Sequence, residues 1–146
     1  GRVKTLTPQV HAGLLHLRDS EEHMSTMKEH GLEPIDLVCV NLYPFEKTVA
    51  DPASTLEHAR GNIDIGGPCM LRASAKNFLR VAAVCDPADY GPLIEELAVQ
   101  GGATSLAQRF ALAKKAFAHT AAYDAAIGAY LSAVGPADLN IYSSGT

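Results

Sequence analysis

The sequence has 146 residues, of which 47% are hydrophobic and 19% charged, and this mixture predicts one globular domain that can bury an apolar core. The formal net charge of -4, without a dense stripe of lysine and arginine, excludes the electrostatic footprint of a nucleic-acid-binding protein. No apolar run approaches the roughly eighteen residues that cross a bilayer, and no leader pattern is present, so we expect a soluble protein that is not exported and does not bind membranes.

The first elements are predicted from breaks and periodicity in the opening thirty residues. Residues 1–8 lack a helical or strand period, and their glycine, threonine and proline content predicts a loop. Leucines at 14, 15 and 17 then lead into a polar segment in which Met24 and Met27 stand three apart. We expect a short amphipathic helix here, ended by Gly31.

Two apolar runs predict the strands of a sheet. Residues 35–42 and 81–85 are almost unbroken apolar segments rich in branched side chains, as strands covered on both faces require. Between them lie a weak helical pattern at residues 54–59 and a better one after Gly67. Strand, helix and strand in this order predict a right-handed crossover and a parallel sheet.

The second half of the chain is predicted to be mostly helical. Residues 88–99 have leucine and isoleucine at helical spacing, and the alanine-rich residues 105–134 predict one long or broken helix. Residues 135–146 are rich in glycine, proline and serine. We therefore expect a domain over 1–134 followed by a linker or disordered tail over 135–146.

The cysteines and histidines give no sign of a metal or redox centre. Cys39, Cys69 and Cys85 are far apart and form no CxxC pair, which predicts reduced, buried side chains in a reducing cytoplasmic compartment. The histidines lack the spacing of metal ligands, and we interpret them as surface or core residues.

The segment at residues 62–68 combines two glycines with a proline at a predicted helix start. Such an end exposes backbone amides that attract anions, although a plain helix start capped by Asp64 or Asn62 explains the pattern as well. Further along, Arg72 and Lys76 share a helix face, where an anionic ligand would relieve their repulsion. A solvated cationic face near the helix end is the equal alternative.

Polar residues also follow the first strand. Asn41 and Tyr43 come directly after it, and ligands bind at the carboxyl ends of strands in open parallel sheets. Tyr43 either donates a hydrogen bond or stacks on a base, or it is a half-buried tyrosine with its hydroxyl in water. Arg2 and Lys4 flank Val3 in a spacing that suits a phosphate but is common on any surface.

Five segments together resemble the IMP cyclohydrolase domain of bifunctional purine biosynthesis proteins. They are GRVKTL followed by a proline, VNLYPFEKTVA, NIDIGGPCMLRASAKN, VCDPADY and KAFAHTAAYDAAI, and they occur in the family's order from Gly1 to about Leu131. The resemblance implies an α/β methylglyoxal-synthase-like three-layer sandwich with a mostly parallel central sheet. It also implies closure of the purine ring of 5-formamidoimidazole-4-carboxamide ribotide to IMP and water, with no cofactor. A homodimer and a transformylase domain in the full-length protein are further implications.

The resemblance also implies residue roles. The lysine of the family's R-A-x-A-K-N motif, here Lys76, is the proton donor and acceptor, and Tyr43 and Asp64 line the same pocket. The catalytic set is completed by Lys4. The substrate-binding positions are Arg2, Val3, Lys4, Thr5, Val40, Asn41, Asp64, Ile65, Gly66, Gly67 and Arg72. No metal ligand is implied.

The sequence departs from the family in two places. Thr7 stands where the family usually has histidine, a change outside the catalytic set. The S-x-S-D-K-T-G and S-T-G-G-T motifs of the family's opening strand and helix are absent. We therefore expect a fold that is incomplete at its N-terminus and a chain that lacks part of the phosphate site by itself.

Other classes of function remain open at this stage. The same fold serves as a non-catalytic nucleotide or effector-binding module elsewhere, and fold alone does not establish function. A lyase acting on a triose phosphate and a purely structural interaction domain are further alternatives. Only the cyclohydrolase requires Lys76, Tyr43 and Asp64 together.

Overall fold

The computed structural model describes residues 4–145, and for residues 143–145 it describes the backbone alone. The chain divides into two compact units. We call Gly1–Leu42 with Ile65–Thr120 the sheet unit, and Tyr43–Asp64 with Ala121–Thr146 the loop unit. Arg2 and Val3, two predicted nucleotide contacts, lie outside the described residues.

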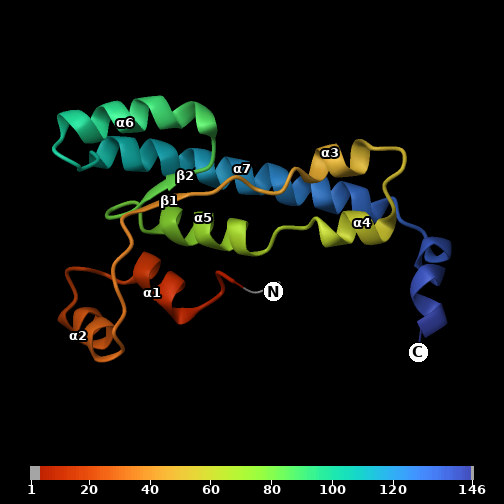
Figure 1. Cartoon of the computed structure of the whole chain (residues 1–146), viewed down its shortest axis with the longest axis horizontal. Helices are drawn as coiled ribbons and strands as arrows, with labels where there is room; N and C mark the ends of the chain where they lie inside the picture. The colour runs from red at the N-terminus through yellow and green to blue at the C-terminus, as the bar shows by residue number, and fades with distance from the viewer. Residues whose placement is uncertain (1–3, 146) are drawn as a thin grey trace. The chain divides into compact units, whose positions relative to one another are not determined.

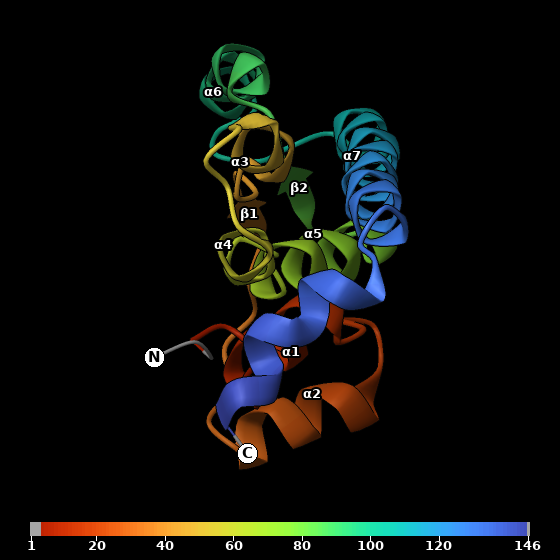
Figure 2. The ribbon, with the colours of Figure 1, turned by 90° about the vertical axis from the view of Figure 1, so that its right-hand side faces the viewer.

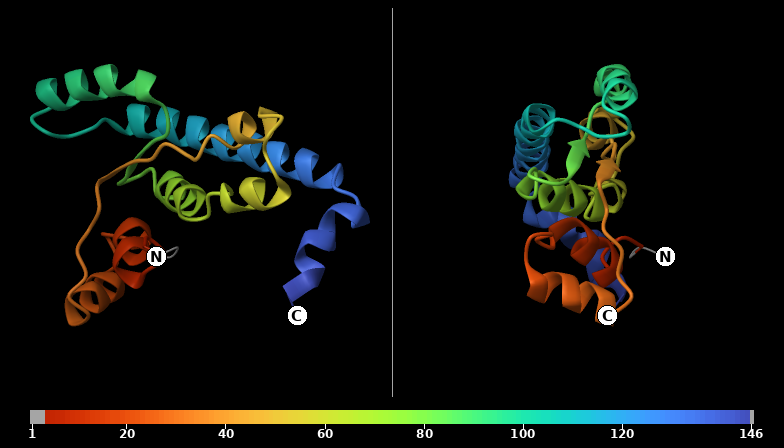
Figure 3. Two further views of the ribbon diagram at one scale, coloured as in Figure 1. Left: turned by 45° about the vertical axis from the view of Figure 1, so that its right-hand side comes forward. Right: turned by 90° about the vertical axis from the view of Figure 1, so that its left-hand side faces the viewer.

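The sheet unit contains two parallel strands, β1 (Leu37–Cys39) and β2 (Ala82–Val84). The arrowheads of both strands point the same way in the right-hand panel of Figure 3. The parallel α/β arrangement predicted from the sequence is thereby confirmed, although both strands are shorter than predicted. The pairing register joins Leu37 to Ala82 and Cys39 to Val84, and it continues by one bond of 2.9 Å from the amide of Val40 to the carbonyl of Val84.

Strand β2 is covered by helices on both of its faces. Ala82 and Val84 pack with Leu93 and Leu112, which come from α6 (Tyr90–Val99) and α7 (Leu106–Ser132). Ala83 points the other way and packs with α5 (Gly66–Lys76) and α7. Figures 1 and 2 show α5 on one side of the strands and α6 on the other. An unbroken apolar run is therefore what β2 requires, because neither face meets water.

Helix α1 (Pro8–Leu15) was not predicted, because threonine and proline were read as signs of a loop. The structure shows that Thr7 is the N-cap, with its hydroxyl accepting a 3.4 Å bond from the amide of Val10, and that Pro8 occupies the first turn. The prediction of a loop through residue 8 is therefore wrong at its end. The predicted amphipathic helix begins later, as α2 (Glu21–Glu29), which is capped by Ser20.

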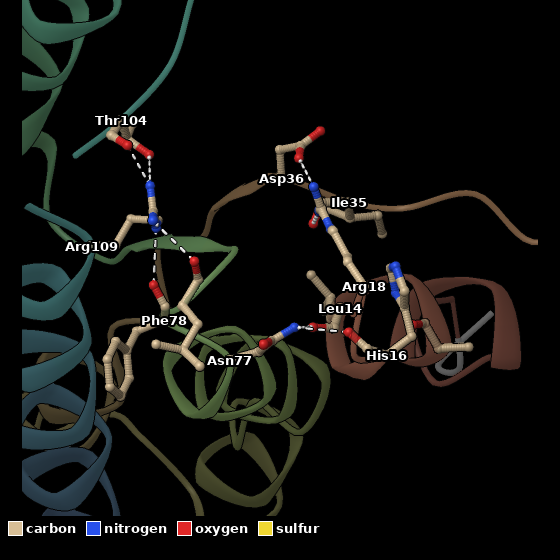
Figure 4. A network of polar contacts seen from close by, with 11 residues as sticks. Leu14, His16, Arg18, Ile35, Asp36, Asn77, Phe78, Thr104 and Arg109 are labelled. Atoms are coloured by element: carbon tan, nitrogen blue, oxygen red, sulfur yellow. Dashed lines mark hydrogen bonds and ion pairs between the residues drawn. The ribbon is translucent and has the colours of Figure 1, made fainter. Parts of the chain in front are cut away.

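Polar contacts fix α1 and α7 to the end of α5 (Figure 4). The buried amide of Asn77 donates to the carbonyl of Leu14 at 2.7 Å and to that of His16 at 3.3 Å. Arg109 of α7 donates to the carbonyls of Phe78 and Leu79, both at 2.9 Å. The asparagine of the RASAKN motif thus has a structural role.

The loop unit contains α3 (Phe45–Ala50), α4 (Leu56–Gly61), the last turns of α7 and the 3-10 helix η2 (Pro136–Gly145). Helix α4 agrees with the weak pattern predicted there, whereas α3 was not predicted. The described part of the tail forms the 3-10 turns of η2, and the prediction of a linker or disordered tail over 135–146 stays a prediction. The predicted domain end at residue 134 stays a prediction.

The cysteine prediction is correct for one side chain and wrong for another. All three thiols are free, but only Cys85 is buried, while Cys69 is half-buried and Cys39 is exposed. Among the residues that the model describes, no helix is long and apolar enough to span a membrane.

Candidate active site

The start of helix α5 lies against Thr5 within the sheet unit. A Cβ atom added to Gly66 would collide with the Thr5 hydroxyl oxygen, so the close approach of these two residues depends on the missing side chain or on a different Thr5 rotamer. The helix begins after Ile65, which occupies the N-cap position and makes no side-chain capping bond of its own. The alternative of a helix start capped by Asp64 or Asn62 stays a prediction. Two segments 61 residues apart in the sequence, each with predicted nucleotide contacts, therefore meet at a helix N-terminus.

Gly67 is buried within the first turn of α5, whereas Ile65 is 57% exposed. Lys4 is also exposed. An α-helix N-terminus carries partial positive charge, which favours a bound anion. The arrangement suits a phosphate or another anionic group, with Lys4 in the same segment as Thr5.

The carboxyl end of β1 carries the next predicted contacts. Val40 is half-buried, and its side chain packs against the apolar clusters of the sheet unit. Asn41 is exposed, and its amide donates to the hydroxyl of Tyr90 at 3.2 Å. Tyr90 belongs to the VCDPADY segment, so this contact joins the ends of the β1 and β2 segments, as expected for a parallel sheet.

The other end of α5 opens onto a groove. Lys76 is the last residue of the helix, and its exposed side chain lines a groove of about 690 Å³ together with Arg72 and Lys114. Two aromatic rings share the lining, with the Arg72 guanidinium 5.4 Å from the ring centre of Phe117 and the Lys114 amine 5.3 Å from that of Phe110. The residues that line the groove include no aspartate or glutamate among those described.

The Lys76 side chain that lines this groove is exposed. Arg72 does share its helix face as predicted, at the spacing of one helical turn. An anion in the groove would meet at least two cations and an aromatic surface.

The loop unit brings Tyr43 and Asp64 together. The Tyr43 amide donates to the Asp64 carboxylate at 3.4 Å, although the two residues are separated by both short helices. The Tyr43 ring is 55% exposed, while Asp64 is half-buried. Two residues from different predicted motifs are thus neighbours, and the Tyr43 ring is accessible to a ligand.

Sequence reasoning missed a residue at the centre of this loop. The hydroxyl of Tyr123 accepts a 2.8 Å hydrogen bond from the Asp64 amide and donates a 3.3 Å bond to the carbonyl of Asn62. Burial is the main cause that raises the pKa of Tyr123. The only signal in the sequence was its membership of the KAFAHTAAYDAAI segment, which gave it no role.

Two further observations concern possible metal ligands and the unit to which each predicted site residue belongs. Among the described residues, no group of three or more potential ligands could hold a metal ion. Lys76, Asn41 and the start of α5 belong to the sheet unit, whereas Tyr43 and Asp64 belong to the loop unit.

Comparison with known proteins agrees on one family. Residues 74–144 match the family model described as AICARFT/IMPCHase bienzyme. The bifunctional purine biosynthesis protein PurH of Magnetococcus marinus is 58% identical over 134 residues, which are 92% of this chain and 25% of that protein. PurH of Cyanothece sp. is 52% identical over 141 residues, or 97% of this chain and 27% of that protein. The crystal structure of ForH has a TM-score of 0.78 and 42% sequence identity, covering 92% of this chain and 69% of that one.

The chain belongs to the AICARFT/IMPCHase bienzyme family. The family resemblance identified from the five segments is therefore confirmed. The chain spans about a quarter of the length of the PurH relatives that it matches.

Proposed function

We propose that this chain is part of the IMP cyclohydrolase domain of a bifunctional purine biosynthesis protein and is incomplete for activity by itself. The substrate is 5-formamidoimidazole-4-carboxamide ribotide, and the products are IMP and water. Besides family membership, the observation that carries the proposal is the hydrogen bond between the Tyr43 amide and the Asp64 carboxylate. It joins the two motifs to which the family resemblance assigns the reacting groups.

The chemistry needs a proton donor and acceptor but no cofactor. The carboxamide nitrogen attacks the formyl carbon and loses a proton, forming the new carbon–nitrogen bond. The formyl oxygen gains negative charge and takes up two protons, equal in number to the one lost by the carboxamide nitrogen and the one lost by the formamido nitrogen. It then leaves as water while the ring carbon–nitrogen double bond forms. A positioned cation stabilises such an oxygen, and a side chain that exchanges protons speeds both steps.

Lys76 is the proposed proton donor and acceptor, with Lys4 as a second cation. Lysine can do both because its amine carries a charge and several donor hydrogens on a flexible stem. Tyr43 and Asp64 orient the reacting groups. Holding both reacting ends of one molecule in a fixed geometry supplies much of the remaining acceleration.

The nucleotide is proposed to bind at the start of α5 and at the carboxyl end of β1. The close approach of the Thr5 side chain to Gly66 supports this assignment, because it puts a predicted nucleotide contact beside the N-terminus of helix α5. The proposed contacts are those named from the sequence: Arg2, Val3, Lys4, Thr5, Val40, Asn41, Asp64, Ile65, Gly66, Gly67 and Arg72.

Several wider features belong to the same proposal. The full domain is a methylglyoxal-synthase-like sandwich, of which the parallel strands and their helices form a part. The protein acts in the cytoplasm as a homodimer and also carries a transformylase domain. The names of the PurH relatives, which call them bifunctional, support the second domain.

The test is an assay of IMP formation, monitored by absorbance, with the protein expressed from its full reading frame. We expect turnover by the wild type and its loss in Lys76→Ala. Lys28→Ala is the matched control, since Lys28 is an exposed lysine near the end of helix α2. Full turnover by Lys76→Ala would remove Lys76 from the mechanism, and ribotide binding without turnover by the wild type would favour an effector-binding module.

A further inference from the structure

We propose that Tyr123 is a positioning residue, whose hydroxyl sets the backbone that presents Asp64 and Tyr43 for the reaction. The inference rests on the proposed function and adds a residue for which no role was predicted. Tyr123 lies on α7, in the part of that helix that belongs to the loop unit.

The hydroxyl of Tyr123 uses both of its hydrogen-bonding capacities on one loop. Its oxygen accepts from the Asp64 amide at 2.8 Å, and its hydrogen is donated to the carbonyl of Asn62 at 3.3 Å. Asn62 is the residue that ends helix α4. One phenol therefore fixes the backbone on both sides of Ile63, between the end of a helix and the predicted catalytic carboxylate.

The ring that carries this hydroxyl is itself held by packing. Tyr123 is 9% exposed, and its ring meets the 1% exposed Phe45 edge to face, with ring centres 6.3 Å apart. Phe45 also contacts the ring of Tyr130 at 5.7 Å. Moving the phenol would expose part of this aromatic cluster to water, which disfavours any displacement of the hydroxyl.

Burial also favours the protonated form of the hydroxyl that the geometry requires. Desolvation is the largest cause that raises the pKa of Tyr123; the hydrogen bond with the Asp64 backbone lowers it, and the negative charge of Asp64 raises it. At neutral pH the phenol therefore remains a donor to the Asn62 carbonyl while accepting from the Asp64 amide.

The constraint passes from Asp64 to Tyr43. The Asp64 carboxylate accepts a 3.4 Å bond from the Tyr43 amide. When the Asp64 backbone moves, this contact changes as well, so one hydroxyl controls the positions of two predicted catalytic residues. A shift of about 1 Å at a reacting group is enough to reduce turnover about a hundredfold.

The decisive variant is Tyr123→Phe, which removes one oxygen and keeps the ring. Its matched control is Tyr130→Phe, which makes the same change on the same helix and against the same Phe45 ring; among the described residues, the Tyr130 hydroxyl has no hydrogen-bond partner. In the protein from its full reading frame, we expect Tyr123→Phe to lower kcat for IMP formation roughly ten- to a hundredfold, with KM changed less than about twofold. Tyr130→Phe should retain wild-type kcat.

Kinetics are expressed per folded molecule, with the folded fraction measured by circular dichroism. A fall in kcat that vanishes after this correction would make Tyr123 merely structural and would overturn the proposal. Equal kcat values for Tyr123→Phe and Tyr130→Phe, with an active wild type, would also overturn the proposal. If the wild type forms no IMP, the proposed function fails instead.

A second measurement does not depend on turnover, and its wild-type part does not depend on the folding of a variant. Hydrogen exchange of the Asp64 amide, followed by NMR in the folded wild type, should be slow because this amide is bonded to the Tyr123 hydroxyl. In Tyr123→Phe it should accelerate, whereas in Tyr130→Phe it should not. An unprotected Asp64 amide in the wild type would contradict the positioning role directly.

Discussion

The sheet unit and the loop unit are stabilised in different ways. In the sheet unit, three clusters of buried, mostly aliphatic side chains surround two short strands. In the loop unit, the buried ring of Phe45 meets two tyrosines, and the hydroxyl of Tyr123 holds the segment that ends at Asp64. The comparison teaches that apolar burial builds the scaffold, whereas an aromatic cluster and its hydrogen bonds hold the loop with the predicted chemistry.

The largest expected effect tests whether the loop unit depends on its aromatic cluster. Phe45→Ala should lower the free energy of unfolding by about 3–5 kcal/mol, because it leaves a cavity beside both tyrosines. Urea unfolding gives the total loss, and hydrogen exchange should show faster opening in α3 and α4 than in β2. Phe110→Ala is the control, since Phe110 is 47% exposed. The claim that the aromatic cluster stabilises the loop unit would be contradicted if Phe45→Ala lost no more unfolding free energy than Phe110→Ala. Equal acceleration of hydrogen exchange in both units would contradict it as well.

A smaller effect tests whether the sheet unit depends on apolar burial alone. Asn77→Ala leaves the buried carbonyls of Leu14 and His16 without the amide that serves both (Figure 4). We expect a loss of about 1–3 kcal/mol in the free energy of unfolding, measured by urea titration. The exposed Asn140 supplies the control variant Asn140→Ala. Wild-type stability in Asn77→Ala would mean that this polar contact contributes nothing to the scaffold.

The smallest effect concerns the half-buried ion pairs of Lys115 in the sheet unit and depends on pH. The amine of Lys115 lies 2.7 Å from the Asp86 carboxylate and 2.8 Å from that of Asp89. The hydrogen bond from Lys115 is the largest cause that lowers the pKa of Asp86. A lowered carboxyl pKa contributes stability above the ordinary aspartate value of about 3.9, and this contribution is lost as the pH falls through the lower folded pKa.

Lys115→Gln should therefore unfold at lower urea concentration than the wild type at neutral pH, and the difference should shrink once the pH falls below about 4. Lys114→Gln changes the neighbouring exposed lysine and serves as the control. A difference between Lys115→Gln and wild type that is the same at all pH values would exclude the ion pair as its cause.

The strands and the long helix could be predicted because their signals are local. Residues 81–85 are wholly apolar, and burial on both faces demands that, while residues 106–132 keep helical periodicity over many turns. The strand at 35–42 was predicted too long, because apolar character reports burial, whereas strand length is set by the partner available for pairing. Helix α1 was missed because Thr7 and Pro8 were taken as loop residues, when together they form an N-cap and a first turn.

The site could be predicted only in part. Family motifs named Tyr43 and Asp64, and the structure places them in contact. The role of Tyr123 had no such signal, since it lies 59 residues from Asp64 and its alanine-rich surroundings resemble any packed helix. The exposure of Lys76 was also unpredictable, because helical spacing gives its face but not what covers that face.

The most direct test of the account is the rate of IMP formation by Asp64→Asn, measured beside Asp51→Asn. Asp51 is an exposed aspartate of the same unit, where it ends helix α3. The account predicts that Asp64→Asn loses about a hundredfold or more in kcat while Asp51→Asn keeps the wild-type rate. Equal rates in both variants and the wild type would contradict the claim that the segment held by Tyr123 takes part in ring closure.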